Sequence, residues 1–320
     1  MAGALTVFSK EIGDHVGSKR YIILFALILI LSIMSAYQGV DFIRNNPNAG
    51  FTAIFTSARY GFSFVYLMVF FGPIIGLALS FDAINKERTS GSLSTLLSQP
   101  IYRDSVINGK FLGGTAALSL LAVSTIAIMC GVAVSFLGFG PTMEDVSRII
   151  LFALLTVLYL TFWLGLGLLY STVTKKTSTS MLMSIATWLF CSVVITIVAM
   201  LVANALAPVS MPMGAGANAT RPFESPEYRE RLRAQFTIQT SIQRISPAYL
   251  YNEAASSILG MAGRTFGFIG PGGGTPYRQL ELTQGLLTSW PQIVALAVGL
   301  IVCFAISYML FLRLEIRPGG

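Results

Sequence analysis

The sequence predicts an all-α membrane protein that crosses the bilayer six times. Of its 320 residues, 54% are hydrophobic and only 11% are charged, whereas soluble domains carry about 25% charged residues. Apolar runs of about 20 residues, long enough to cross about 30 Å of hydrocarbon as a helix, recur along the chain. No run has a charged residue or a histidine in its interior. The six expected spans are residues 21–37, 60–81, 111–137, 149–170, 180–206 and 291–312.

The segment before the first span, residues 1–20, predicts an amphipathic helix at the membrane interface. Leu5, Phe8, Ile12 and Val16 recur at helical spacing and form one apolar stripe. A helix of this kind lies flat at the level of the lipid headgroups, with its apolar face toward the acyl chains. We therefore expect this helix to run along one surface of the membrane.

A polar segment between the second and third spans, residues 82–110, is the most informative part of the sequence. Ser90 or Ser92 can cap a short helix, and Pro100 would end it. Three leucines, Leu93, Leu96 and Leu97, would give this helix an apolar face. Such a helix could dock into a cleft of a soluble partner, with nearby charges setting the register. The alternative is a solvated loop with ordinary helix caps.

Residues 207–289 interrupt the pattern of spans. Ser225-Pro226-Glu227 predicts a helix start, with serine at the cap and proline at the first position, and this helix should run to about residue 244. Ser246-Pro247 predicts a second helix that ends near residue 259, before a glycine-rich stretch at 260–274. We expect a helical hairpin with a flexible arm and no second globular domain, so that residues 1–320 form a single transmembrane domain.

The distribution of charges predicts the orientation. With the N-terminus in the cytoplasm, all six lysines fall on the cytoplasmic side, whereas the two short outer loops hold three arginines. Basic residues are enriched in short cytoplasmic loops. Both termini should therefore be cytoplasmic in a protein of the cell membrane, with residues 207–289 outside. The same bias explains the net charge of +7 without a nucleic-acid partner.

The residues that would support catalysis or nucleotide binding are missing. The single histidine, His15, lies outside the spans, and the three cysteines lie inside them, which indicates neither a catalytic triad nor a metal site. A phosphate-binding loop requires serine or threonine after glycine and lysine, but Gly109-Lys110 is followed by Phe111. We expect a non-catalytic chain that binds no cofactor itself. The uncharged spans also argue against a proton-driven carrier.

The segment from residue 82 to residue 113 resembles a known family. Its pattern is Asp82-x-Ile-x-x-Glu87-Arg88-x-x-Gly91-x-Leu93-x-x-Leu96-Leu97-Ser-x-Pro100-Ile-x-Arg103, followed by Gly109-Lys110-Phe-Leu-Gly113. This pattern resembles the type-2 ABC exporter permease superfamily, including its nitrous-oxide-reductase-maturation and multidrug-like branches. The resemblance implies a separate cytoplasmic ABC ATP-binding subunit, which holds ATP and Mg²⁺, and a second copy of the permease, most simply as a homodimer.

The resemblance also implies roles for individual residues. Those expected to couple the chain to the ATP-binding subunit are Glu87, Arg88, Gly91, Leu93, Leu96, Leu97, Arg103, Lys175 and Lys176. Related permeases line a translocation path with their second and fifth spans, and the matching aromatic residues here are Phe64, Phe70, Phe71, Trp188 and Phe190. Aromatic side chains in spans more often pack internally or contact lipid, so that alternative stays open.

Gly72 and Gly76 place small residues four apart in the second span, which allows another helix to approach closely. They could form a dimer seam or pack within one subunit.

The resemblance implies the membrane subunit of an ATP-driven exporter, embedded in the lipid bilayer. Its uncharged spans suit an apolar, amphipathic or peptide-like substrate. Two alternatives stay open. One is a complex that uses the same coupling to transmit force to an outer partner without moving a substrate, and the other is a standalone channel or carrier.

Overall fold

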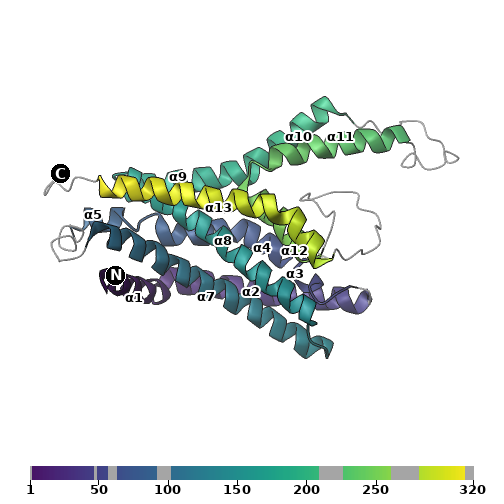
Figure 1. The fold of residues 1–320 in the computed structure, drawn as a ribbon, viewed down its shortest axis with the longest axis horizontal. Helices are drawn as coiled ribbons and strands as arrows, with labels where there is room; N and C mark the ends of the chain where they lie inside the picture. The colour runs from purple at the N-terminus through teal and green to yellow at the C-terminus, as the bar shows by residue number, and fades with distance from the viewer. Residues whose placement is uncertain are drawn as a thin grey trace.

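The computed structural model describes residues 2–46, 49–56, 63–91, 102–208, 226–260 and 281–313, and throughout these ranges the regular elements are helices (Figure 1). Six helical segments in these ranges are long and apolar enough to cross a membrane. The prediction of an all-α polytopic membrane protein is therefore confirmed. The spanning segments are α2 (Lys19–Asn45), α4 (Phe64–Ser80) continued by α5 (Asn85–Thr89), α7 (Arg103–Leu137), α8 (Met143–Val173), α9 (Thr177–Leu189) continued to the end of α10 (Ile195–Leu206), and α13 (Leu282–Leu312).

Several helices extend well beyond the apolar runs that predicted them. The α7 helix begins at Arg103, so its first two turns belong to the polar segment 82–110, and its 35 residues correspond to about 50 Å at 1.5 Å per residue. The α13 helix begins at Leu282 and contains Pro291 in its interior, although residue 291 was expected to begin the span. Polar residues continue a helix outside the hydrocarbon, and hydropathy does not detect them.

The core of the bundle lies around α8, which packs against α4, α7, α12 (Pro247–Ile258) and α13. Tyr159 and Trp163 of α8 are fully buried. A Cβ atom added to Gly76 of α4 would lie 2.7 Å from the carbonyl oxygen of Leu160, and one added to Gly72 would lie 3.0 Å from the Tyr159 ring. In this structure the two glycines therefore pack within one chain.

The helices of the long segment begin and end close to where the sequence predicted, and each packs against a different part of the molecule. The α11 helix (Pro226–Gln243) lies along α10, whereas α12 packs against α13, α8 and α4 (Figure 1). Tyr251 of α12 is fully buried, stacks on Tyr159 with ring centroids 4.3 Å apart, and shares a 3.0 Å hydrogen bond with Thr156. The α12 helix is therefore part of the bundle.

Different helices lie at the two ends of the bundle. The helix α1 (Ala2–Val16), α5 and the last turn of α13 lie at one end, here called the α5 end, and α12 lies toward the other, the α12 end (Figure 1). A small separate hydrophobic cluster closes the α5 end. Its buried members are Ile84, Val106, Ile107, Leu168 and Phe311.

Candidate functional site

The short helix α5 is fixed to the end of α8 at its first turn. The backbone N–H groups of Ile84 and Asn85 both donate to Ser171 Oγ, at 2.9 and 3.1 Å. The side-chain amide of Asn85 donates to Thr174 Oγ1 at 2.8 Å. These bonds lie in a buried region, where unpaired polar groups would be costly. Buried hydrogen bonds to α8 therefore fix the start of the polar segment 82–110, and this start is not a solvated loop.

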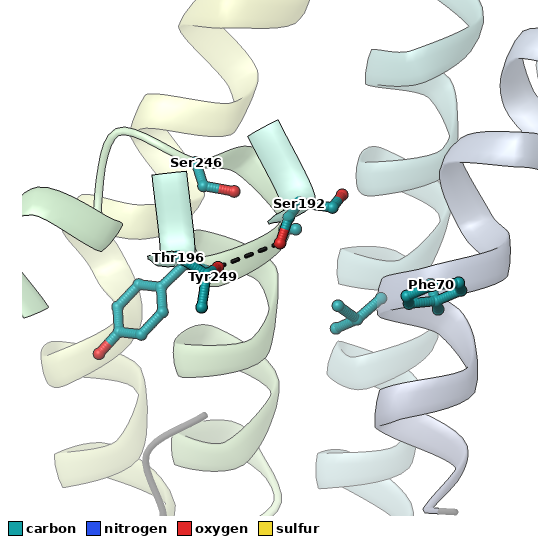
Figure 2. A pocket seen from close by; sticks show the side chains of 7 residues that line it. Phe70, Ser192, Thr196, Ser246 and Tyr249 are labelled. Atoms are coloured by element: carbon teal, nitrogen blue, oxygen red, sulfur yellow. Dashed lines mark hydrogen bonds between the residues drawn. The ribbon is translucent and has the colours of Figure 1, made fainter. Parts of the chain in front are cut away.

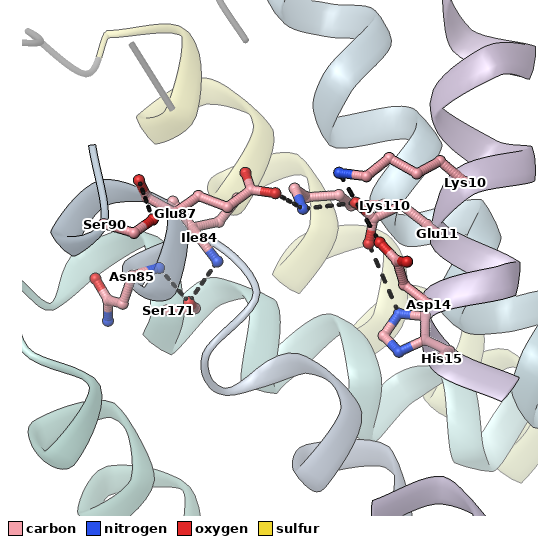
Figure 3. A network of polar contacts seen from close by, with 10 residues as sticks. All are labelled: Lys10, Glu11, Asp14, His15, Ile84, Asn85, Glu87, Ser90, Lys110 and Ser171. Carbon is pink, nitrogen blue, oxygen red and sulfur yellow. Dashed lines mark hydrogen bonds and ion pairs between the residues drawn. The ribbon is translucent and has the colours of Figure 1, made fainter. Parts of the chain in front are cut away.

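Lys110 of α7 connects α5 to α1 through two buried ion pairs. Its ammonium nitrogen lies 2.8 Å from Glu11 Oε1 on α1 and 2.7 Å from Glu87 Oε1 on α5 (Figure 3). We call these three residues the Lys110 cluster. The Lys110 side chain is only 4% exposed, so the two carboxylates replace the water that its charge has lost. Three elements far apart in the sequence thus share one polar contact.

Glycines on α7 bring α1 close enough to make this contact. A Cβ atom on Gly109 would lie 2.6 Å from Val7 Cγ1, and one on Gly113 would lie 2.7 Å from Glu11 Cβ. The buried face of α1 is accordingly formed by Val7 and Glu11, while Leu5 is 66% exposed. The face of α1 that packs on α7 is therefore a different one from the apolar stripe that was predicted to face lipid.

The predicted apolar stripe is less buried within the protein. Phe8, Ile12 and Val16, the other members of the stripe, are partly buried. The interfacial position of α1 in a membrane stays a prediction.

Two further contacts surround the Lys110 cluster. His15 Nε2 lies 3.9 Å from Glu11 Oε2, and burial lowers the pKa of His15, which the charge of Glu11 only partly offsets. Arg20 at the start of α2 donates to Asp82 Oδ2 at 2.7 Å, with its guanidinium carbon 5.5 Å from the centre of the Phe81 ring. The segment that leaves α4 is thus held by α2 as well as by α8.

Comparison with known proteins agrees with the pattern in residues 82–113. The model of a family described as ABC-2 family transporter protein matches residues 5–316. This chain belongs to the ABC-2 family. The match includes all six spanning segments and α1 from residue 5 onward, and therefore all three residues of the Lys110 cluster. The resemblance to type-2 ABC permeases is therefore confirmed.

Two curated relatives are described as probable ABC transporter permease protein NosY. The relative from Pseudomonas aeruginosa is 30% identical over 139 residues, which cover 43% of this chain and 47% of the relative. The relative from Stutzerimonas stutzeri is 29% identical over 143 residues, which cover 45% of this chain and 48% of the relative. The alignment thus spans about half the length of the curated relatives.

Some of the coupling residues expected for this ABC-2 chain gather at the α5 end. Glu87 enters the Lys110 cluster, and Arg88 is partly buried on the same helix. Gly91 has a φ of +73° just after α5, a backbone conformation that favours glycine. Exposed Lys175 and Lys176 follow Thr174, which binds Asn85.

Of the remaining coupling residues, Arg103 lies at the same end of the bundle, and the others lie outside the described residues. Arg103 contacts the carbonyl oxygen of Leu312 at 3.5 Å and lies near the end of α13. Leu93, Leu96 and Leu97, with Ser92 and Pro100, lie outside the described residues. Ser90 lies at the C-terminal end of α5, and the helix for which it was a candidate cap lies outside the described residues.

The sequence reasoning missed Glu11. The signal available was an acidic residue directly beside Ile12 of the apolar stripe, where an interfacial helix would place lipid. Lys110 lay inside the recognised pattern, but its position between Gly109 and Phe111 gave no reason to expect a buried ammonium group.

The aromatic residues proposed for a path in this ABC-2 chain do not form one group. Phe64 is fully buried against Phe55 and Phe152. Phe70 is exposed and meets the edge of Trp188 at 5.4 Å between ring centroids. Phe71 is partly buried, and Phe190 is exposed.

A small pocket beside Phe70 is lined by hydroxyl groups from the fifth span and the start of α12 (Figure 2). Among the described residues there is no group of three or more side chains that could hold a metal ion.

Proposed function

We propose that this chain is the permease subunit of an ATP-driven ABC exporter. A separate cytoplasmic subunit would bind and hydrolyse ATP with Mg²⁺, and a second copy of this chain would complete the translocation path as a homodimer. Membership of the ABC-2 family and the six spanning segments support this proposal. The spans of this chain consist mainly of aliphatic and aromatic residues and lack charges in their interiors. Such spans suit an apolar, amphipathic or peptide-like substrate.

The observation that carries the proposal is the Lys110 cluster. A partner that pushes on α5 displaces Glu87, and Glu87 is joined through Lys110 to both α7 and α1. Because α5 is also bonded to Ser171 and Thr174, the same displacement reaches α8. Ion pairs with little exposure resist separation, since each separated charge would be left buried without compensation. A motion at α5 would therefore be transmitted to the spans.

The distribution of basic residues supports placing the α5 end in the cytoplasm. Of the six lysines, Lys10, Lys19 and Lys110 lie on α1 or on the first turns of α2 and α7. Lys86 lies on α5, and the remaining two form the turn between α8 and α9. Lysine enrichment on one side marks the cytoplasmic side, and both termini would lie there.

A second function is favoured by the shape of the molecule. The α10 and α11 helices form a pair that diverges from the bundle toward the α12 end (Figure 1). The same coupling could use this pair to act on an outer partner without moving a substrate. Flux of a labelled amphipathic compound in proteoliposomes separates the two functions, because only an exporter moves the compound.

The proposal is tested by purifying the tagged chain from its native membranes in mild detergent and identifying what copurifies by mass spectrometry. We expect a soluble subunit with a nucleotide-binding motif in near-stoichiometric amount, together with ATPase activity. A chain recovered alone in several detergents would contradict the proposal and favour a standalone channel or carrier.

The variant Glu87→Gln separates a coupling role from simple assembly. It removes one charge from the Lys110 cluster, so we expect ATP hydrolysis to lose its dependence on the permease while the ATP-binding subunit still copurifies. The matched control is Lys86→Gln, which removes an exposed charge from the neighbouring position of the same helix. Equal behaviour of the two variants would contradict a coupling role for Glu87.

A further inference from the structure

The fifth span contains a π-helical segment that divides it into two parts. Residues Phe190–Val194 form this segment between α9 and α10, and the N–H of Ile195 donates to the carbonyl oxygen of Phe190, five residues earlier. A π-helical turn holds one residue more than an α-helical turn, and such turns are rare and found frequently at functional sites. Nothing in the apolar pattern of residues 180–206 indicates it, because the residue types remain those of an ordinary span.

A hydroxyl group from outside the helix holds the π-helical segment. Ser246 Oγ donates to the carbonyl oxygen of Cys191 at 2.7 Å. Ser246 directly precedes α12, which is fixed to the bundle at its other end: Arg148 donates to the carbonyl oxygen of Ile258 at 2.9 Å, and Thr52 donates to that of Leu259 at 3.0 Å. Ser246 is therefore an anchor on the rigid bundle that reaches one carbonyl of the π-helical segment.

The two parts of the fifth span are held differently. On the α9 side, Ser180 donates to the carbonyl oxygen of Phe81 at 2.7 Å, and Thr187 shares a 2.6 Å hydrogen bond with Tyr170 of α8. Beyond the π-helical segment, α10 packs chiefly on α11, and the pair diverges from the bundle (Figure 1). Burial does not separate the two parts, because three α10 side chains and two α9 side chains are buried, so the difference lies in the hydrogen bonds that α9 makes to the bundle.

A small pocket of about 30 Å³ lies beside the π-helical segment, so the packing on this side is incomplete. Phe70 of α4 lies on one side of the pocket, and Ser192, Thr196 and Ser246 lie on the other (Figure 2). The Ser192 hydroxyl oxygen is buried and has no hydrogen-bond partner among the described residues. The bond from Ser246 is thus a directional contact that ties the π-helical segment to the bundle, beside the packing of Cys191 against the core.

We propose that the π-helical segment Phe190–Val194 is a hinge about which α10 and α11 move together relative to the bundle. The hydrogen bond from Ser246 to Cys191 is the latch that holds the hinge in the arrangement seen here. Release of the latch lets α10 swing across the pocket that separates the π-helical segment from Phe70. The hinge is a property of this chain and does not depend on transport or on an ATP-binding subunit.

Hydrogen–deuterium exchange of the purified full-length chain in detergent, read by mass spectrometry of peptides, tests the hinge. In the wild-type chain, peptides from residues 190–206 should exchange faster than peptides from α9. The variant Ser246→Ala should speed exchange in residues 190–206 by about fivefold, the factor that corresponds to the loss of one hydrogen bond. Exchange in α12 should stay unchanged.

Two further variants make the result specific to the latch. Ser241→Ala removes a hydroxyl group that bonds only within α11, to the carbonyl oxygen of Thr237, and should leave residues 190–206 unchanged. Ser246→Thr keeps a hydroxyl group and should restore slow exchange. The proposal is overturned if residues 190–206 exchange as slowly as α9 in the wild-type chain, or if Ser246→Ala and Ser241→Ala behave alike. Neither outcome bears on whether an ATP-binding subunit copurifies.

Discussion

Burial of an ammonium group removes its favourable hydration. For Lys110 the ion pairs with two carboxylates on other helices compensate for this cost in free energy. In Lys110→Met, Glu11 and Glu87 would face each other across the α5 end without a cation. Removing one partner of a buried ion pair costs about 3–5 kcal/mol, and we expect the free energy of unfolding to fall by this amount. Denaturant unfolding in detergent, followed by tryptophan fluorescence, measures the change.

Two controls separate this effect from the loss of any lysine. Lys10 is exposed and lies 3.9 Å from Asp14, so Lys10→Met should cost less than about 1 kcal/mol. A triple variant with Met at positions 11, 87 and 110 should recover most of the stability, because it leaves no buried charge. If Lys110→Met is as stable as Lys10→Met, the cluster does not hold the α5 end together.

The burial of His15 predicts that stability depends on pH. Its pKa is lowered from 6.5, first by burial and then by Lys110, against the opposing charges of Glu11, Asp14 and Asp82. The unfolded chain therefore binds a proton more readily than the folded chain. The stabilisation is fully present above pH 6.5 and is lost as the pH falls from that value toward the folded pKa.

Thermal unfolding between pH 7.5 and pH 5.5 measures this dependence. We expect the midpoint temperature to fall toward the acidic end of the range for the wild-type chain. The variant His15→Gln should remove most of the slope in this interval, because His15 is the single histidine of the sequence and histidine is the side chain whose ordinary pKa lies in this range. A slope that survives the substitution would assign the effect to another group.

At the scale of elements, Arg148 shows how a polar side chain fixes a helix inside the bundle. It is almost fully buried and donates to the carbonyl oxygen of Ile258 at the C-terminal end of α12, where a positive charge is favourable. Hydrogen bonds to charged groups contribute about 1.5–3 kcal/mol, and Arg148→Met should lower the free energy of unfolding by about that amount. It should also raise the rate of proteolysis near residue 260.

The matched control for Arg148 is Arg44. Arg44 also donates to a backbone carbonyl group, that of Phe136, at 2.6 Å, but the contact is exposed. Water can replace this bond, so Arg44→Met should change the free energy of unfolding by less than about 1 kcal/mol. Equal effects of the two substitutions would mean that α12 is not anchored through Arg148.

The sequence could predict those helices whose apolar runs match the thickness of the hydrocarbon region. Helix ends such as Leu282 escaped prediction because polar residues continue a helix beyond the lipid. The caps at Pro226 and Pro247 correctly predicted where α11 and α12 begin. They could not indicate that α12 packs inside the bundle, since that depends on the ring of Tyr159 on a distant helix.

The same limit applies to the candidate site. Glu87 could be found because it belongs to a short continuous pattern within residues 82–103. Its partner Glu11 lies 99 positions before Lys110, and no local periodicity connects residues so far apart. A buried charge is determined by the packing of whole helices, here by the close approach of α1 to Gly109 and Gly113.

At the scale of the whole molecule, the contacts divide the chain into a bundle and a projecting pair of helices. The α4, α7, α8, α12 and α13 helices pack around one hydrophobic core, and the α5 end is bonded to it by the Lys110 cluster and Ser171. The α10 and α11 helices pack chiefly on each other. A push at α5 thus enters the rigid part of the molecule, and the π-helical segment is where the pair can respond.

The orientation of the whole molecule in the membrane can be decided by labelling its two ends. Lys175 is exposed at the α5 end, and Met143, at the start of α8, is 86% exposed at the opposite end. In a background where the three native cysteines are replaced by alanine, we expect an impermeant maleimide to label Met143→Cys in intact cells. Lys175→Cys should react only after permeabilisation, because lysine-rich ends face the cytoplasm. The reverse pattern would place the α5 end outside, where no ATP-binding subunit could reach Glu87.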